Sequence, residues 1–349
     1  MDCLRCAYCN ICPIYRIEGW ESVSPRGKIQ LLDKKLSNRL VKDFYKCTVC
    51  GLCEVVCQSK LELTRIWEEN RAKLVKSKKY MPAHKKIADA VLLYGNPYAA
   101  EQEARVLLNS PSNVLYFAGC MANFKVKNIA ECTVKVLKLL GLEFKVAGKS
   151  EVCCGSTMLR TGFIDVAEKL FLKNVKNWQK MNVEKIITSC PGCYRTIKSN
   201  YPKIAEKKKI DFNFEVVHIT QFLERELKKL DLKLGTVTYH DPCHLGRHSK
   251  VYEEPRNILK KIGYKIIEME RNRDFSICCG AGGGLRAQFP EISEKITLER
   301  ILEAESTGAE TLVTSCPFCV YQFSKVSRLK VRDVVEEVYS SMREVELKI

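Results

Sequence analysis

The chain has 349 residues, a hydrophobic fraction of 46% and a formal net charge of +17 at pH 7. Its length exceeds what one hydrophobic core usually supports and predicts two or three domains. No apolar run approaches the roughly 18 residues of a membrane-spanning helix, so we expect no transmembrane segment.

Cysteine is the most informative part of the composition, because 18 of the 19 cysteines fall into four ordered sets. Two sets have four members and two have five: Cys3, Cys6, Cys9 and Cys12; Cys47, Cys50, Cys53 and Cys57; Cys120, Cys153, Cys154, Cys190 and Cys193; Cys243, Cys278, Cys279, Cys316 and Cys319. Cysteines repeated at Cys-x2-Cys-x2-Cys spacing are typical of iron–sulfur cluster ligands.

Disulfides and structural zinc explain this pattern less well. Disulfides suit small secreted domains, and a first set beginning at Cys3 leaves no room for a cleaved leader. Structural zinc prefers two separated cysteine pairs. We therefore expect a reduced, cytoplasmic protein. Ionised cluster thiolates would also cancel about ten positive charges. Because the lysines are scattered, we expect no nucleic-acid partner.

Residues 1–75 are predicted to form a ferredoxin-like domain with two cubane [4Fe-4S] clusters. In two-cluster ferredoxins the last cysteine of each set binds the other cluster. This rule assigns Cys57 to the first cluster and Cys12 to the second, although only two residues separate Cys9 from Cys12 where three are usual. Residues 24–44 predict one helix and residues 61–77 another. A helical linker over 76–111 contains the Gly95-Asn96-Pro97 breaker.

The remainder of the chain repeats itself, with one unit over 112–232 and another over 233–349. Cys120 recurs as Cys243 and Cys190 as Cys316, which are offsets of 123 and 126 residues. Each unit alternates short β-rich runs with amphipathic helices, and the cysteines follow the runs. This alternation predicts two α/β cysteine-rich domains with parallel sheets, related by a pseudo-twofold axis. The tail, 331–349, is predicted to be a helix with an apolar packing face.

The adjacent cysteines of each five-membered set point in different directions, so they cannot both be ordinary legs of one cubane. Glycines follow these pairs and allow close backbone approach and positive φ, so we assign Gly155, Gly280 and Gly282 as cofactor-binding residues. A dinucleotide-binding loop is not expected, because Leu285 stands where its third glycine would be.

Four segments carry a specific resemblance: SPRGK, YHDPCHLGRH, VYEEPRNILK and EMERNRDFSICCGAGGG. They resemble the catalytic subunit of the two-subunit heterodisulfide reductases. They are also similar to iron–sulfur subunits of glycolate or lactate oxidases and of anaerobic glycerol-3-phosphate dehydrogenase. The resemblance extends from Cys3 to about Asp333. It implies one or two noncubane [4Fe-4S] clusters, each bound by a complete five-cysteine set, and this chain retains all ten cysteines.

Several other residues have simpler interpretations. Cys132, the cysteine outside the sets, is expected to be a buried apolar residue of a helix. His240, His244 and His248 have the i, i+4, i+8 spacing of a metal-binding face, but the preceding strand and Pro242 disfavour a zinc site. His244 could donate a proton near Cys243. No catalytic residue is assigned.

No flavin, nicotinamide or phosphate-binding fingerprint is found, so the chain needs a redox partner. The favoured function is an iron–sulfur electron-transfer subunit between a flavoprotein dehydrogenase and a quinone, cytochrome or other acceptor. The alternative is a catalytic disulfide reductase; a zinc-bound scaffold is a third interpretation. The partner would be a flavoprotein dehydrogenase subunit or a membrane cytochrome or quinone-linked subunit, which could hold the protein on the inner face of the membrane. No substrate pocket is recognised beyond the cluster loops, and this favours the electron carrier.

Overall fold

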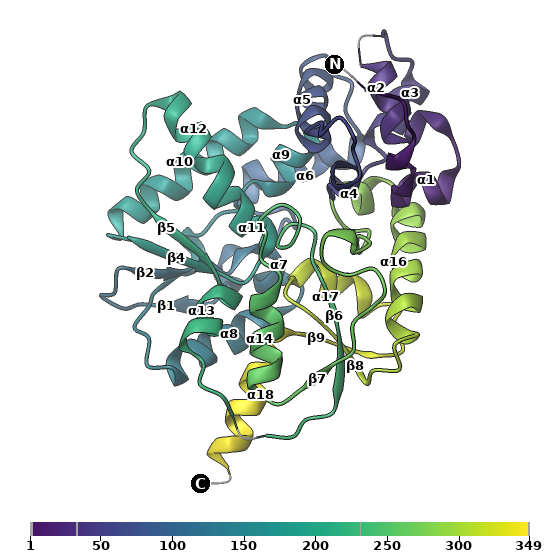
Figure 1. The fold of residues 1–349 in the computed structure, drawn as a ribbon. Helices are drawn as coiled ribbons and strands as arrows, with labels where there is room; N and C mark the ends of the chain where they lie inside the picture. Colours follow the sequence, from purple (N-terminus) through teal and green to yellow (C-terminus); the bar gives the residue numbers. More distant parts are fainter. Residues whose placement is uncertain (1–2, 33, 231, 348–349) are drawn as a thin grey trace.

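A computed structural model of the chain describes residues 3–32, 34–230 and 232–347. It contains a small helical module at the N-terminus and two α/β units, and the helical module lies across one end of both units (Figure 1). The described helices are not long and apolar enough for any of them to cross a membrane.

The N-terminal module consists mainly of short helices. They are η1 (Tyr8–Ile11), α1 (Pro13–Glu18), η2 (Glu21–Val23), α2 (Pro25–Leu31), α3 (Asn38–Tyr45), α4 (Leu52–Val55) and α5 (Leu63–Lys76). The helix predicted over 61–77 is confirmed as α5. The next helix, α6 (Pro82–Tyr94), ends at Gly95, which has φ +70°, so the predicted breaker does end a helix.

The single helix predicted over 24–44 is wrong, because α2 ends at Leu31 and α3 begins at Asn38. The hydroxyl of Ser37 accepts a hydrogen bond from the Leu40 amide and caps the second helix. The apolar side chains also face different clusters: Leu32 packs with Trp67, whereas Leu36 packs with Val41 and Tyr45. One straight helix would not serve both clusters.

The first α/β unit is built on a three-stranded parallel sheet of order β2-β4-β5. Its elements, with the preceding short segments, are η3 (Gln102–Ala104), β1 (Leu107–Leu108), β2 (Val114–Tyr116), α7 (Gly119–Phe124), α8 (Lys127–Leu139), β3 (Val146–Ala147), η4 (Gly148–Ser150), α9 (Ser156–Thr161), α10 (Ile164–Lys180), β4 (Lys185–Thr188), α11 (Pro191–Arg195), η5 (Thr196–Asn200), α12 (Tyr201–Lys208), β5 (Glu215–His218) and α13 (Ile219–Glu226). Leu115 also bridges to Lys145 in the parallel sense, just before β3.

The second unit has a four-stranded parallel sheet of order β7-β6-β8-β9. Its elements are β6 (Thr236–His240), α14 (Glu253–Lys261), β7 (Lys265–Ile266), η6 (Arg273–Phe275), α15 (Leu285–Gln288), α16 (Pro290–Glu305), β8 (Thr311–Thr314), α17 (Pro317–Phe323), β9 (Lys330–Asp333) and α18 (Val334–Glu346). If the bridge at Lys145 is counted as an edge strand next to β2, the first sheet has the equivalent strand order. The prediction of parallel sheets is confirmed.

The tail helix predicted from residue 331 begins three residues later, because 330–333 pairs with β8 as an edge strand. Asp333 caps α18 by accepting a hydrogen bond from the Val335 amide, and Glu336 accepts from the Asp333 amide in return. The helix packs on α8 in a core shared by the two units, where Val334 and Val338 are buried. Its apolar face is therefore a packing face.

Candidate functional site

The strands bring the cysteines of each five-membered set to one edge of each sheet. Cys190 and Cys316 follow β4 and β8 and stand at the N-termini of α11 and α17. Pro191 and Pro317 occupy the first positions of these helices, where the missing amide hydrogen has no cost. Because parallel strands end at a common edge, cysteines distant in sequence become neighbours.

The first set of five is buried and closely packed. Its thiols are linked by hydrogen bonds from Cys120 to Cys153, from Cys153 to Cys154, and from Cys193 to both Cys154 and Cys190. Hydrogen bonds from Cys153 and Cys193 lower the pKa of the Cys154 thiol to about 6. All 19 cysteines lie within the described residues, and none of them forms a disulfide.

The second set of five is arranged in the same way, with one additional contact. Cys278 hydrogen-bonds to Cys243 and Cys279, and Cys319 to Cys279 and Cys316. The additional contact joins Cys278 to Cys50 of the helical module. The thiols of Cys278 and Cys319 hydrogen-bond to the Cys279 sulfur and hold the pKa of Cys279 well below its ordinary value.

The N-terminal cysteines gather in two small cavities, with Cys12 and Cys57 exchanged between the sets. One cavity is lined by Cys3, Cys6, Cys9 and Cys57. The other is lined by Cys12, Cys47, Cys50 and Cys53. The short spacing between Cys9 and Cys12 is spanned by η1, in which the Cys12 amide donates to the Cys9 carbonyl at 3.1 Å. A tight 3-10 turn therefore carries Cys12 to the second group.

Two of the three predicted cofactor-binding glycines direct an amide at a cysteine sulfur. The Gly155 amide donates to Cys153 Sγ and the Gly280 amide to Cys278 Sγ, each at 3.4 Å. Both glycines have positive φ, +81° and +90°, which favours glycine there. Gly282 has a different role, since a Cβ at this position would lie 2.6 Å from the Thr48 carbonyl oxygen. Its lack of a side chain lets the loop approach the helical module.

Three buried cations lie near the cysteines and form no ion pair with a carboxylate of the described residues. Lys28, Arg71 and Arg247 donate hydrogen bonds only to backbone carbonyls, and none of them has an ion-pairing carboxylate among the described residues. Burial lowers the pKa of Arg247, but the neighbouring Cys50, Cys243 and Cys278 outweigh it and raise that pKa. A buried cation needs a compensating anion.

These observations test whether the residues fit iron–sulfur clusters. A [4Fe-4S] cluster with four thiolates carries a net charge of about −2, which would compensate cations such as Lys28 and Arg247. Thiolates are also the ligands that this cofactor uses. The four groups of convergent, unpaired cysteines and the uncompensated cations beside them therefore fit anionic clusters.

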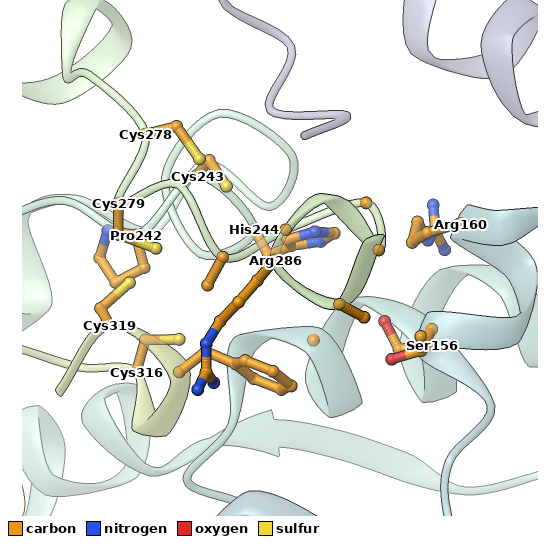
Figure 2. A pocket seen from close by; sticks show the side chains of 18 of the residues that line it. Ser156, Arg160, Pro242, Cys243, His244, Cys278, Cys279, Arg286, Cys316 and Cys319 are labelled. Atoms are coloured by element: carbon orange, nitrogen blue, oxygen red, sulfur yellow. The ribbon is translucent and has the colours of Figure 1, made fainter. Parts of the chain in front are cut away.

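A cavity of about 290 Å³ opens between the two α/β units and α6. All five cysteines of the second set line one side (Figure 2). Ser156 and Arg160 of the first unit stand opposite, with His244 and Arg286 between the two sides. No substrate pocket was recognisable in the sequence beyond the cluster loops, and in the structure these loops, α6 and the first unit together line one. The cavity forms only where three distant segments meet.

The cavity is mostly apolar, with cationic groups at separate points. Tyr98 and Phe318 contribute aromatic surface. Arg160 is paired with Glu68 at 2.5 Å, whereas the guanidinium of Arg286 lies over the Tyr321 ring at 4.3 Å and has no carboxylate partner among the described residues. The cavity can therefore accept an apolar group that also carries negative charge.

The three predicted histidines do not form one metal-binding face. One ring nitrogen of His240 lies within 4.8 Å of the sulfur atoms of Cys279 and Cys319, whereas His244 and His248 face each other with ring centroids 5.1 Å apart. Burial, followed by the charge of Arg195, holds the pKa of His244 well below its ordinary value. Burial therefore disfavours a protonated His244 ring, and the expected proton donation near Cys243 stays a prediction.

Sequence reasoning did not find the residues that hold the parts of the site together. Arg71 donates to carbonyls of Tyr45, Cys47, Arg160 and Gly283 and so joins the helical module to both α/β units. Nothing near Arg71 in the sequence marks this role. Arg247 lies four residues after Cys243, and its proximity to that ligand candidate was the one available signal. Cys132 is only partly buried, at the edge of the shared core.

Comparisons with known proteins agree with this arrangement. The family described as "4Fe-4S dicluster domain" matches residues 1–61, and the family described as "Cysteine-rich domain" matches residues 114–198 and 237–324. The chain is 37% identical to a subunit of the dihydromethanophenazine:CoB--CoM heterodisulfide reductase of Methanosarcina acetivorans, over 91% of this chain and 87% of that protein.

Two further comparisons are more distant. The chain is 30% identical to EtfAB:quinone oxidoreductase of Syntrophomonas wolfei, over 92% of this chain and 49% of that protein. The crystal structure of a hypothetical protein from Helicobacter pylori superposes with a TM-score of 0.61 at 14% identity, covering 87% of this chain and 64% of that one. At this identity the likeness shows the fold alone.

Proposed function

The chain belongs to the family of cysteine-rich heterodisulfide reductase subunits and is an iron–sulfur subunit of an oxidoreductase; from this premise we propose that it cleaves a disulfide in the cavity between its two α/β units. The observation that carries the proposal is the cavity wall, to which the second set contributes all five of its cysteines. A disulfide held there would lie directly against the redox centre.

We propose four [4Fe-4S] clusters. Two are cubanes, and two are noncubane clusters bound by the five-membered sets. The proposed groups are Cys3, Cys6, Cys9 and Cys57; Cys12, Cys47, Cys50 and Cys53; Cys120, Cys153, Cys154, Cys190 and Cys193; Cys243, Cys278, Cys279, Cys316 and Cys319. Support comes from the convergence of each group and from the buried cations Lys28 and Arg247, which such clusters would neutralise.

The order of the groups supports a direction of electron flow. The first cubane group includes Cys6, which is exposed, and it is therefore the suitable entry point for a partner. The second cubane group touches the second five-membered set through Cys50 and Cys278. The clusters, when bound, supply electrons one at a time. The chain's own residues would hold these centres in series.

The cavity's chemistry suggests the kind of disulfide. Tyr98 and Phe318 suit an apolar chain, and Arg286, which has no carboxylate partner among the described residues, suits an anionic group on it. The reaction consumes two electrons and two protons and releases two thiols, which balances one disulfide bond. The relative from Methanosarcina acetivorans is named for the CoB–CoM heterodisulfide, so that compound is the first substrate to test.

A second candidate function is electron transfer without disulfide chemistry. It is supported by the similarity to EtfAB:quinone oxidoreductase, of which this chain spans about half. In that case the partner would be a flavoprotein dehydrogenase subunit. The disulfide reductase would instead receive electrons from a membrane cytochrome or quinone-linked subunit, which would hold it at the inner face of the membrane.

The proposed architecture places domain boundaries near residues 75, 111 and 232, with the two α/β units related by a pseudo-twofold axis. The equivalent strand orders of the two sheets support this relation. Their shared core along α8 and α18 supports it as well.

The deciding experiment uses the full chain purified without oxygen and reduced chemically. Addition of the CoB–CoM heterodisulfide should release two thiols per disulfide in rapid turnover with the reductant. Cys278→Ser should abolish this release, whereas Cys132→Ser is the matched control because Cys132 lies outside all four sets. Rapid electron transfer to a flavoprotein with no thiol release from any disulfide would overturn the reductase and favour the carrier.

A further inference from the structure

His240 occupies a position that distinguishes the second five-cysteine set from the first. It stands at the end of β6, is only 1% exposed, and has a ring nitrogen within 4.8 Å of the sulfur atoms of Cys279 and Cys319. The sheet register identifies its counterpart. Tyr239 pairs with the residue three before Cys316, and Tyr116 pairs with the residue three before Cys190. The residue after each tyrosine is His240 in the second unit and Phe117 in the first.

Hydrogen bonding fixes the protonation of the His240 ring. Arg300 Nε donates to His240 Nδ1 at 3.1 Å. A guanidinium group has no acceptor atom, so Nδ1 must carry a lone pair and the ring proton must be on Nε2. Arg300 is itself held by Glu303 at 2.8 Å and by the Arg271 carbonyl, so the donor cannot turn away freely. The ring is therefore a neutral donor at Nε2.

The Nε2–H group has no hydrogen-bond partner among the described residues, although it is buried. A buried polar hydrogen without an acceptor is unfavourable and calls for a partner. The Phe323 ring packs edge-on against the imidazole at 4.8 Å and restricts its orientation. Sulfur atoms of Cys279 and Cys319 are the nearby groups that become good acceptors once they carry negative charge.

We propose that His240 Nε2–H donates a hydrogen bond to a cysteine sulfur of the second set, Cys279 or Cys319, and thereby holds the reduction potential of that site above the potential of the first. This inference rests on the proposed function, because it requires a cluster at each set. His240 is a positioning residue and not a cluster ligand, since its Nε2 retains the proton. Hydrogen bonds to cluster sulfurs are among the factors that set these potentials.

The direction of the effect follows from charge. Reduction adds negative charge to the cluster and its sulfurs, so a donated hydrogen bond stabilises the reduced state more than the oxidised state. Electrons that arrive through Cys50 and Cys278 would therefore collect at the site that faces the cavity. Phe117, which packs against Trp178, offers the first site no such donor.

The test compares His240→Phe, which installs the first unit's residue, with His240→Gln, which keeps an N–H donor. In the full chain, redox titration followed by electron paramagnetic resonance should show one signal with a lower reduction potential in His240→Phe. The expected decrease is about 59 mV, which makes a one-electron reduction tenfold less favourable. The other signals should keep their potentials, and His240→Gln should restore most of the loss. An unchanged potential in His240→Phe with full iron content would overturn the inference.

A second measurement on the unaltered protein remains decisive if His240→Phe does not fold. With ¹⁵N-labelled histidine, pulsed resonance should detect one weakly coupled nitrogen at one reduced centre. A strong coupling typical of a bound ligand, or no coupling, would overturn the inference. Failure of the proposed function is distinguishable. If no cluster is bound at the second set, Cys279→Ser leaves the iron content unchanged, and if the protein only carries electrons, no thiol is released although the shift of potential in His240→Phe remains.

Discussion

The two five-cysteine sets share their spacing but have different surroundings. In the first set, Cys120 lies 3.4 Å from Arg105, whose charge is cancelled by Glu151 in a fully buried ion pair. In the second, Arg247 lies beside the cysteines with no carboxylate partner among the described residues. The ligand pattern determines which cofactor a site can hold, and the neighbouring charges determine how that cofactor can be used.

The two sets also differ in their access to the cavity and to the helical module. The second set lines the cavity and touches Cys50 of the helical module, whereas the first set contributes to the cavity only through neighbours such as Ser156 and Gly192. Under the proposed function, the second set would therefore stand between the electron supply and the substrate. No cysteine of the first set lines the cavity, so a cluster there would be better placed to store an electron than to receive the proposed disulfide.

The largest expected effect is on disulfide cleavage, and it differs between the two sets. Cys279→Ser should lower disulfide cleavage by at least about a thousandfold, because it removes a ligand from the site that faces the substrate, whereas Cys154→Ser should lower it by about tenfold. Thiol release from the reduced protein measures both. Each variant should also lose about four of about sixteen irons. Equal loss of activity in the two variants would show that both sites take part in the chemistry.

The next effect concerns the two arginines. Arg105→Met should lower the free energy of unfolding by about 3–5 kcal/mol with or without iron, because Glu151 remains buried without its partner. Arg247→Met should destabilise the iron-loaded protein more than the iron-stripped protein, because only in the loaded protein does it remove a cation beside anionic clusters. The hydrogen bonds to the Cys50 and Ser276 carbonyls are lost in both forms. Unfolding midpoints of loaded and iron-stripped protein measure the difference. An equal effect of Arg247→Met in both forms would contradict an anionic cluster there.

A smaller effect is spectroscopic and concerns the cubane through which electrons would reach the second set. Cys12→Ser should change mainly the signal of the cubane built on Cys47, Cys50 and Cys53, because these four side chains line one cavity. Cys57→Ser should change the other cubane instead. Resonance spectra of the reduced variants provide the measurement. If Cys12→Ser altered only the cubane at Cys3, Cys6 and Cys9, the exchange of ligands between the sets would be wrong.

The smallest effect is expected at Cys132, which belongs to the first unit but to neither set. Cys132→Ser should cost less than about 1 kcal/mol in unfolding free energy, because the side chain is only partly buried at the edge of the core. Iron content and visible absorption should not change. A loss of iron in this variant would mean that the four sets do not account for all cluster ligands.

The sequence by itself determined the class of cofactor and the repeated organisation. Cysteine spacing is a local property, and it indicates the type of ligand and cofactor before any long-range contact is known. Strand and helix alternation is also local, which is why the runs before Cys120 and Cys243 were predicted correctly as β2 and β6. Where local signals competed, as between Leu31 and Asn38, the apolar pattern predicted one helix although side-chain packing required two.

Only the tertiary structure decided the features that depend on long-range contacts. The cavity exists because residues as distant as Ser156 and Cys319 are brought to face each other. Arg71 and His240 acquire their roles from partners remote in sequence, such as Gly283 and Arg300. Hydrogen bonds and buried charges act through space over a few ångströms, and sequence spacing does not encode which distant groups will be that close.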